Sequence, residues 1–247
     1  MVYDKLIRSL LIFILLISLL ALACDLPSGV DIPVLQRPTP TPSPTPPPPS
    51  ELLIFRIPAP LYTVSLEPGE TIAGSRIQYV GRTGDVYQVR IDGQDANKRI
   101  ADSLFWRGVV APGALAKYDL RLGTELLGGL VAAGSFEVSI LNAEPVLLDN
   151  AFQPTGDLHY SGMPVSYQVR VGEMIPGTTM VYEGLRTQGA ELSGRAGHPY
   201  VAAGDSLVYT GQLRENIAVR YNVRVLSLDA TILRLDGTAE LWLETSP

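Results

Sequence analysis

A repeat separated by 103 positions is the feature that most constrains how this chain can fold. The segment GETIAGS at Gly69–Ser75 returns as GEMIPGT at Gly172–Thr178. When residues 62–141 are laid over residues 165–244 without a gap, 15 of the 80 positions are identical. A constant offset over this length indicates a duplicated folding unit. We therefore expect two β domains with the same topology, at residues 51–145 and 160–247, joined by a linker at 146–159.

The hydrophobic pattern within both copies has the period of β-strands. In Lys117–Leu122, tyrosine and leucine fall on one face and charged side chains on the other, and Arg220–Val225 repeats this alternation. Turn residues separate such segments, and no amphipathic helix of useful length is apparent. The predicted fold is therefore all-β: two tandem homologous small antiparallel β-barrel or sandwich domains. They follow a signal segment and a proline-rich tether.

Two local predictions concern the C-terminal part of each copy. The dipeptide Asp236–Gly237 lies between two strand-like runs and is typical of a type I′ hairpin turn. Arg121 and Glu137 recur as Arg224 and Glu240, although most other positions changed. Each of these side chains falls on the polar face of its strand. We therefore expect the arginine and glutamate of each copy to form a cross-strand ion pair.

Residues 1–24 have the pattern of an export signal. Lys5 and Arg8 give a positive start, and the apolar run Leu10–Ala23 is shorter than the roughly 20 residues of a spanning helix. The run ends at Leu20–Cys24 (LALAC), which resembles the lipobox of bacterial lipoproteins. The resemblance implies that residues 1–23 are a signal peptide and that a lipid on Cys24 anchors the chain to the extracytoplasmic side of the cell membrane. The alternative is an ordinary cleaved signal peptide that ends near an unrelated cysteine.

Residues 24–50 are predicted to be a tether between this anchor and the domains. Threonine, serine and proline alternate from residue 38, and four prolines end the run. Such a sequence favours polyproline II geometry, in which twelve residues extend about 37 Å at ~3.1 Å each. A stiff spacer would hold the folded part clear of the membrane. Its use as a docking ligand is the weaker interpretation, because it lacks the basic or aromatic residues of such ligands.

Charge and cysteine content exclude several kinds of partner. The formal net charge is −6, whereas a nucleic-acid partner requires a basic patch. Cys24 is the only cysteine, so the two domains contain no disulfide and no cysteine-based zinc site. Calcium-loop and phosphate-loop motifs are missing as well. We therefore expect no cofactor and no metal; the expected partners are the membrane, through the anchor, and an envelope protein or glycan.

The segment Gly204–Leu207 (GDSL) resembles the nucleophile block of the GDSL hydrolases. That family takes its base from a late Asp-x-x-His, and this chain has no such motif and no histidine after His198. A serine nucleophile needs a positioned base and an oxyanion hole. We therefore interpret Asp205–Ser206, like Asp102–Ser103, as turn residues whose side chains bond nearby backbone.

Repeated acids are the second candidates for catalysis. Glu70 and Glu173 recur in the motif, and Glu137 and Glu240 recur near the end of each copy. Two carboxyl groups about 5 to 9.5 Å apart could hydrolyse a glycoside. The simpler interpretation is that these acids are solvated or paired residues of turns and strands.

Aromatic residues are the candidates for a binding surface. Trp106 and Tyr209 hold equivalent places, although repeated aromatics of a small β unit are usually needed in its core. Trp242 is not repeated, because Ser139 holds its place, and it shares the polar strand face with Glu240. An outward, unrepeated tryptophan suggests an interface.

The function expected from these features is that of a lipoprotein presenting two β modules for binding or structural roles in the cell envelope, not an enzyme. The alternative is an envelope hydrolase using Ser206 or a carboxylate pair. A transport substrate-binding lipoprotein is disfavoured, because the βαβ alternation of such folds is missing.

Overall fold

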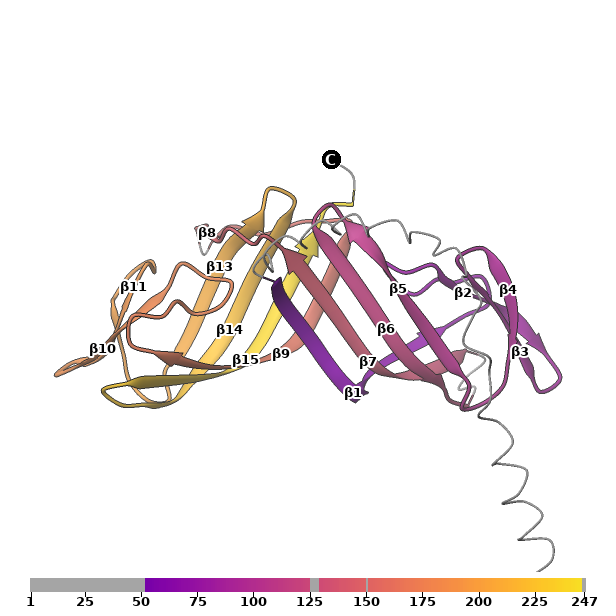
Figure 1. The fold of residues 1–247 in the computed structure, drawn as a ribbon, viewed down its shortest axis with the longest axis horizontal. Coiled ribbons are helices and arrows are strands. Elements are labelled where there is room, and N and C mark those ends of the chain that lie inside the picture. The colour runs from indigo at the N-terminus through magenta and orange to yellow at the C-terminus, as the bar shows by residue number, and fades with distance from the viewer. Residues whose placement is uncertain (1–51, 125–128, 150, 246–247) are drawn as a thin grey trace, which may run out of the picture. The chain divides into compact units, whose positions relative to one another are not determined.

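The computed structural model describes residues 52–124, 129–149 and 151–245 (Figure 1). The predicted signal peptide, Cys24 and the tether lie outside the described residues. The regular elements of the described residues are all β-strands, which confirms the all-β class. None of the described residues belongs to a helix with the length and hydropathy needed to span a membrane.

The N-terminal half consists of two antiparallel sheets. The larger sheet has the order β1-β7-β6-β5, with β1 (Leu52–Leu66), β7 (Leu130–Leu141), β6 (Ala114–Leu122) and β5 (Ser103–Ala111). The smaller sheet has the order β2-β3-β4, with β2 (Ile77–Thr83), β3 (Val86–Ile91) and β4 (Gln94–Lys98).

The C-terminal half repeats this arrangement and adds one short strand. Its larger sheet has the order β8-β13-β14-β15-β9, with β8 (Val146–Leu147), β13 (Ser206–Arg214), β14 (Ile217–Leu228), β15 (Ile232–Leu243) and β9 (Leu158–Arg170). Its smaller sheet has the order β10-β11-β12, with β10 (Val181–Arg186), β11 (Gly189–Ser193) and β12 (Tyr200–Val201). Apart from β8, which lies in the predicted linker, the strand orders of the halves are the same, as a duplicated unit predicts.

The repeated motif forms the same tight turn in both halves. Its first glycine has a φ of 96° in the first copy and 82° in the second, a conformation that favours glycine. The central isoleucine, Ile72 or Ile175, is buried. The hydroxyl that follows the second glycine, on Ser75 or Thr178, donates to the carbonyl of that isoleucine at 2.9 Å. The motif is therefore closed by hydrogen bonds between its own residues, and its central isoleucine packs in the core.

A tyrosine of the larger sheet fastens each motif in place. The Tyr118 hydroxyl donates to the Ala73 carbonyl at 2.5 Å, and the Tyr221 hydroxyl donates to the Pro176 carbonyl at 3.1 Å. Burial raises the pKa of both phenols well above the ordinary value. Both hydroxyls therefore stay protonated and remain donors at neutral pH.

The predicted hairpin turn at Asp236–Gly237 is wrong. β15 runs unbroken through this dipeptide, and Gly237 lies opposite Val223 of β14. A Cβ at position 237 would overlap the carbonyl oxygen of Asn222 and would lie 2.6 Å from Val223 Cα. The glycine is therefore explained by the close approach of the neighbouring strand and not by a turn.

The turn between β14 and β15 is formed by residues 229–231. Asp229 Oδ1 accepts hydrogen bonds from the Thr231 N–H at 2.7 Å, the Thr231 hydroxyl at 2.7 Å and the Ile232 N–H at 2.8 Å. These hydrogen bonds lower the pKa of the Asp229 carboxyl below its ordinary value.

The predicted ion pairs between the repeated arginines and glutamates are wrong, although the strands that carry them are neighbours. In the β6–β7 ladder, Arg121 lies opposite Ala133 and Glu137 lies opposite Lys117. The arginine is therefore displaced from the glutamate by the four positions from 133 to 137, or about 13 Å along the strand. Glu137 is paired instead with Arg56 of β1, at 3.4 Å.

The second copy has the same displacement. Arg224 lies opposite Asp236, and Glu240 lies opposite Arg220. Glu240 Oε2 is 3.1 Å from His159 Nε2 of β9. The alternation of apolar and polar residues correctly predicted the polar faces of β6, β7, β14 and β15. It did not predict which residues lie opposite each other on neighbouring strands.

A bulge in β1 changes the offset between the copies at their first strand. Phe55 lies opposite Val138, and Tyr160 lies opposite Leu241, which is 103 positions after Val138. Phe55 and Tyr160 are thus equivalent although they are 105 positions apart. The two extra residues lie where the β1 register shifts, between residues 57 and 62.

These equivalent side chains join the two halves reciprocally. The Phe55 ring lies 6.1 Å from the Tyr221 ring of the other half, and the Tyr160 ring lies 4.8 Å from the Phe136 ring. The Tyr160 hydroxyl also lies 3.5 Å from that of Tyr118, the counterpart of Tyr221. Each first strand therefore pairs with its own sheet and packs its beginning against the opposite half.

The neighbouring leucines make the same exchange. Leu53 Cδ2 would lie 2.8 Å from a Cβ at Gly177, and Leu158 Cδ1 would lie 3.1 Å from a Cβ at Gly74. Both glycines belong to the motif of the opposite half. The buried side chains of the two halves accordingly form one hydrophobic cluster, and the described residues belong to one compact unit.

Candidate functional site

Trp242 lies on the outer face of the larger sheet of the C-terminal half. On β15 it lies opposite His159 of β9 and Ala218 of β14, which flank β15 on its two sides. It alternates with the fully buried Leu241 and Leu243. The alternation therefore places the indole on the polar face, as predicted, where it is half-buried.

Two basic side chains hold the indole ring. The His159 imidazole stacks on it, with 4.7 Å between centroids and 10° between planes. The Arg220 guanidinium carbon lies 5.6 Å from the ring centroid. Because Glu240 in turn bonds His159, the stacking and the ion pair together fix the orientation of the ring.

Arg220 also fastens a loop over this part of the sheet. Its Nη2 donates to the Phe152 carbonyl at 2.7 Å, and its Nε donates to Thr210 Oγ1 at 3.3 Å. Thr210 is fully buried. The arginine thus links the sheet to the segment that forms one wall of a cavity beside Trp242.

This cavity, named here the Trp242 groove, has a volume of about 280 Å³. Its lining includes the apolar side chains of Leu148, Phe152, Pro154, Ile217, Ala218 and Trp242 and the polar side chains of Thr155, Gln212, Glu215, Asn216 and Glu244. Phe152 is 47% exposed, and both glutamates are exposed, so the groove opens to solvent. An apolar surface with a few hydrogen-bonding groups is typical of small-molecule sites.

The amide side chains of the groove are held by backbone carbonyls. Gln212 Nε2 donates to the Glu215 carbonyl at 2.7 Å, and Asn216 Nδ2 donates to the Pro112 carbonyl at 3.1 Å. Within the described residues, the carboxylates of Glu215 and Glu244 accept no hydrogen bond. They are therefore acceptors that a ligand can use.

The first copy lacks the side chains that form the Trp242 groove in the second copy. Ser139 holds the place of Trp242 in the first copy, and Leu115 lies opposite it, in the place of Ala218. The first copy therefore has neither the indole nor the small neighbour that leaves room beside it.

Trp106 and Tyr209 do not form a surface. They are 4% and 1% exposed, respectively. The Trp106 Nε1–H donates to Asp92 Oδ1 at 3.1 Å, and the Tyr209 hydroxyl accepts the Thr179 N–H at 3.2 Å. Their proposed role at an interface is corrected to core packing, because both rings lie on the inner face of their strands; Trp242 alone keeps that role as a prediction.

The aspartates before Ser103 and Ser206 are turn residues, as predicted. Asp102 Oδ2 accepts the Arg99 N–H at 2.8 Å, and Asp205 Oδ2 accepts the Ala202 N–H at 2.7 Å. These hydrogen bonds close the turn that precedes β5 or β13. They occupy the carboxylate of the aspartate next to each serine.

No histidine is positioned to activate Ser206, which begins β13 opposite Arg224. The chain has two histidines. His159 contacts Glu240 at 3.1 Å, and His198 Nδ1 lies 3.2 Å from the Tyr200 carbonyl oxygen.

The repeated glutamates have local partners. Glu70 Oε2 accepts the Glu67 N–H at 2.7 Å, and Glu173 Oε2 accepts the Arg170 N–H at 3.0 Å, so both acids close the motif turn. Glu137 and Glu240 make the ion pairs already described. Within the described residues, no group of three or more His, Cys, Asp or Glu side chains could hold a metal ion. Cys24, the predicted lipidation site, lies outside them.

Comparison of the chain with known protein families, with curated proteins and with solved structures finds no match.

Sequence reasoning found Trp242 but not the residues around it. His159 and Arg220 reach the indole only because β9 and β14 flank β15 in this register. The wall at 148–155 has no periodic pattern. The one sequence feature that pointed to this site was the difference between the copies at position 242, where the first copy has Ser139.

Proposed function

We propose that this chain is a lipid-anchored, extracytoplasmic lipoprotein whose β structure binds a glycan of the cell envelope in the Trp242 groove. The observation that carries the binding role is the groove itself, where an oriented indole lies beside carboxylate and amide groups. The lipobox-like sequence and the proline-rich tether support the anchored location.

The apolar and polar side chains that line the groove suit the two kinds of surface on a sugar. A sugar ring presents apolar C–H groups on its face and hydroxyls on its edge. Aromatic side chains pack against the former, and carboxylates accept hydrogen bonds from the latter. The alternative, an envelope hydrolase, has no positioned base beside Ser206 to support it.

Anchoring is tested by Cys24→Ala and by globomycin, which blocks lipoprotein signal cleavage. The Cys24→Ala change should abolish labelling by radioactive palmitate and release the protein from membranes, whereas globomycin should leave a labelled precursor that keeps its signal peptide. An unlabelled Cys24→Ala protein that stays in the membrane would indicate an uncleaved helical anchor instead.

Binding is tested by Trp242→Ala against purified envelope glycans and peptidoglycan fragments. We expect the affinity to fall about tenfold or more, because a buried aromatic contact at the centre of a site contributes about 1.4 kcal/mol or more. Isothermal titration calorimetry measures the loss. Ser139→Ala, at the equivalent place of the first copy, is the matched control and should bind normally. Equal binding by the Trp242→Ala protein would refute the site.

A further inference from the structure

The C-terminal half shows how the outer edge of its larger sheet accepts an added strand. β8 pairs antiparallel with β13. The Leu148 N–H donates to the Thr210 carbonyl at 3.0 Å, and the Glu144 N–H donates to the Leu213 carbonyl at 2.9 Å. Residues 144–148 therefore lie along this edge as an extended segment.

The equivalent edge of the N-terminal half is formed by β5. β5 and β13 pair with β6 and β14 in the same register, so Arg107 and Val110 hold the places of Thr210 and Leu213. Among the described residues, only β6 pairs with β5. The carbonyls of Arg107 and Val110 are thus placed to accept the two hydrogen bonds that β8 gives to β13.

β5 carries few of the features that protect an edge from pairing. Its sequence, SLFWRGVVA, contains no proline and no lysine. Phe105 is 50% exposed and Val109 is 70% exposed. An exposed edge strand with apolar side chains is a template for a further strand, and many proteins bind extended peptides in this way.

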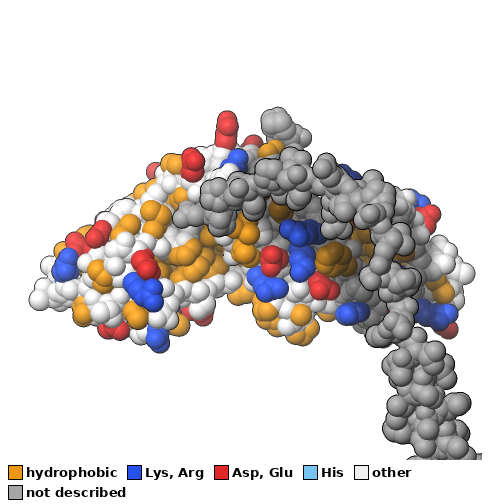
Figure 2. Space-filling model, in the orientation of Figure 1, with side chains coloured by type: hydrophobic (Ala, Val, Ile, Leu, Met, Phe, Trp, Pro, Cys, Tyr) orange, Lys and Arg blue, Asp and Glu red, His pale blue; other side chains and the backbone are white. Residues whose placement is uncertain are grey.

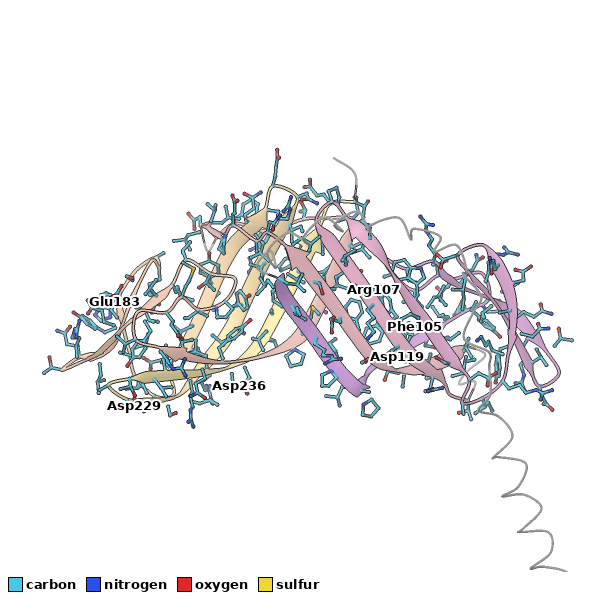
Figure 3. The ribbon with its side chains drawn as sticks, viewed as in Figure 1. Phe105, Arg107, Asp119, Glu183, Asp229 and Asp236 are labelled. Atoms are coloured by element: carbon cyan, nitrogen blue, oxygen red, sulfur yellow. The ribbon has the colours of Figure 1, made fainter. Side chains whose placement is uncertain are left out.

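Two cations lie next to each other at this edge. Arg107 lies opposite Lys117 of β6, and neither makes an ion pair within the described part of the chain. Figure 2 shows Lys and Arg side chains on this face, with Asp and Glu side chains among them and hydrophobic ones beside them. Figure 3 shows Arg107 and Phe105 together on β5, with Asp119 on the neighbouring strand. Lys117 lies opposite Glu137 of β7 on its other side, so Arg107 is the cation that a carboxylate on an added strand would compensate.

We propose that the outer edge of β5 docks an extended segment of a partner protein, which adds as an antiparallel strand and places a carboxylate opposite Arg107. The internal template is segment 144–148 on β13, where Leu148 holds the position opposite Thr210. A second copy of this chain is a poorer occupant, because β5 itself contains no acidic residue to offer.

The probe is a fluorescent peptide with the sequence of residues 142–149 carrying Leu148→Glu. It is titrated by fluorescence anisotropy against the full chain in detergent micelles. We expect binding, with roughly two- to fivefold higher affinity than the peptide carrying Leu148→Lys. Arg107→Glu in the protein should reverse this preference. Arg121→Glu, on the same face but away from the edge, should leave it unchanged.

The backbone contacts have their own test. N-methylation of the peptide at the positions of residues 144 and 148 removes both donors and should abolish binding. Bound peptide should slow amide hydrogen exchange in β5. Binding that survives methylation, that leaves exchange in β5 unchanged, or that ignores Arg107→Glu would overturn the proposal. So would sedimentation data showing that two copies occupy each other's β5 edge.

Discussion

At Gly134 and Gly237 the backbone of the next strand comes so close that no side chain fits. A Cβ at Gly134 would overlap the Asp119 carbonyl oxygen, just as one at Gly237 would overlap that of Asn222. Glycine stands at both places because β7 lies close to β6, and β15 lies close to β14, at this point.

We expect Gly134→Ala and Gly237→Ala each to lower the free energy of unfolding by about 1–3 kcal/mol, because the backbone must shift to admit the methyl group. Urea denaturation followed by circular dichroism measures the change. Gly123→Ala is the control: its Cβ would lie 3.3 Å from the Val131 carbonyl oxygen and needs only a small adjustment. Equal losses for all three variants would contradict the close-approach explanation.

Residue-scale features were predictable where their causes are local. The turns at Asp102 and Asp205 depend on hydrogen bonds within a few residues, and the structure confirms the predicted role of both aspartates. The ion partner of Glu137 was not predictable, because it depends on which residue of β1 lies opposite, and β1 contains a bulge.

The β14–β15 hairpin depends on the ionised form of Asp229. Its pKa is lowered from 3.8, chiefly by the hydrogen bonds from Thr231. A carboxyl whose pKa is lower in the folded state stabilises the fold above its unfolded pKa, and this contribution is lost as the pH falls through the folded value.

Asp229→Asn should therefore lower the melting temperature at neutral pH, and the difference from the native chain should shrink below about pH 4. Thermal melts between pH 7 and pH 2 measure the effect. A difference that stays constant down to pH 2 would show that the ionised carboxylate is not the cause.

At the scale of elements, the alternation of apolar and polar residues predicted the strands and which face of each is buried. The constant offset of 103 residues predicted that both halves have the same strand order. The pairing of β8 with β13 left no comparable trace. Segment 144–148 is too short to show a period, and it adds to an edge formed more than 60 residues later. The Trp242 groove was only partly predictable for the same reason, since one wall comes from this irregular stretch.

The two copies are expected to unfold as one cooperative unit, because each first strand packs into the opposite half. Phe55→Ala should cost about 3–5 kcal/mol and should lower the stability of both halves together. Differential scanning calorimetry should show a single transition before and after the change. Leu61→Ala, at a site that is 69% exposed, should have an effect within about 0.5 kcal/mol. Two separate transitions in the native chain would mean that the halves are independent domains.

β1 has a mechanical consequence that follows from its position. It is the first strand of the described residues, so a force applied through the proposed tether reaches β1 before the other described strands. β1 is bonded to β7 on both sides of its bulge, and its beginning packs against the other half through Leu53 and Phe55. Both halves therefore resist tension on the proposed tether. β1 cannot separate from β7 without also breaking its contacts with the C-terminal half.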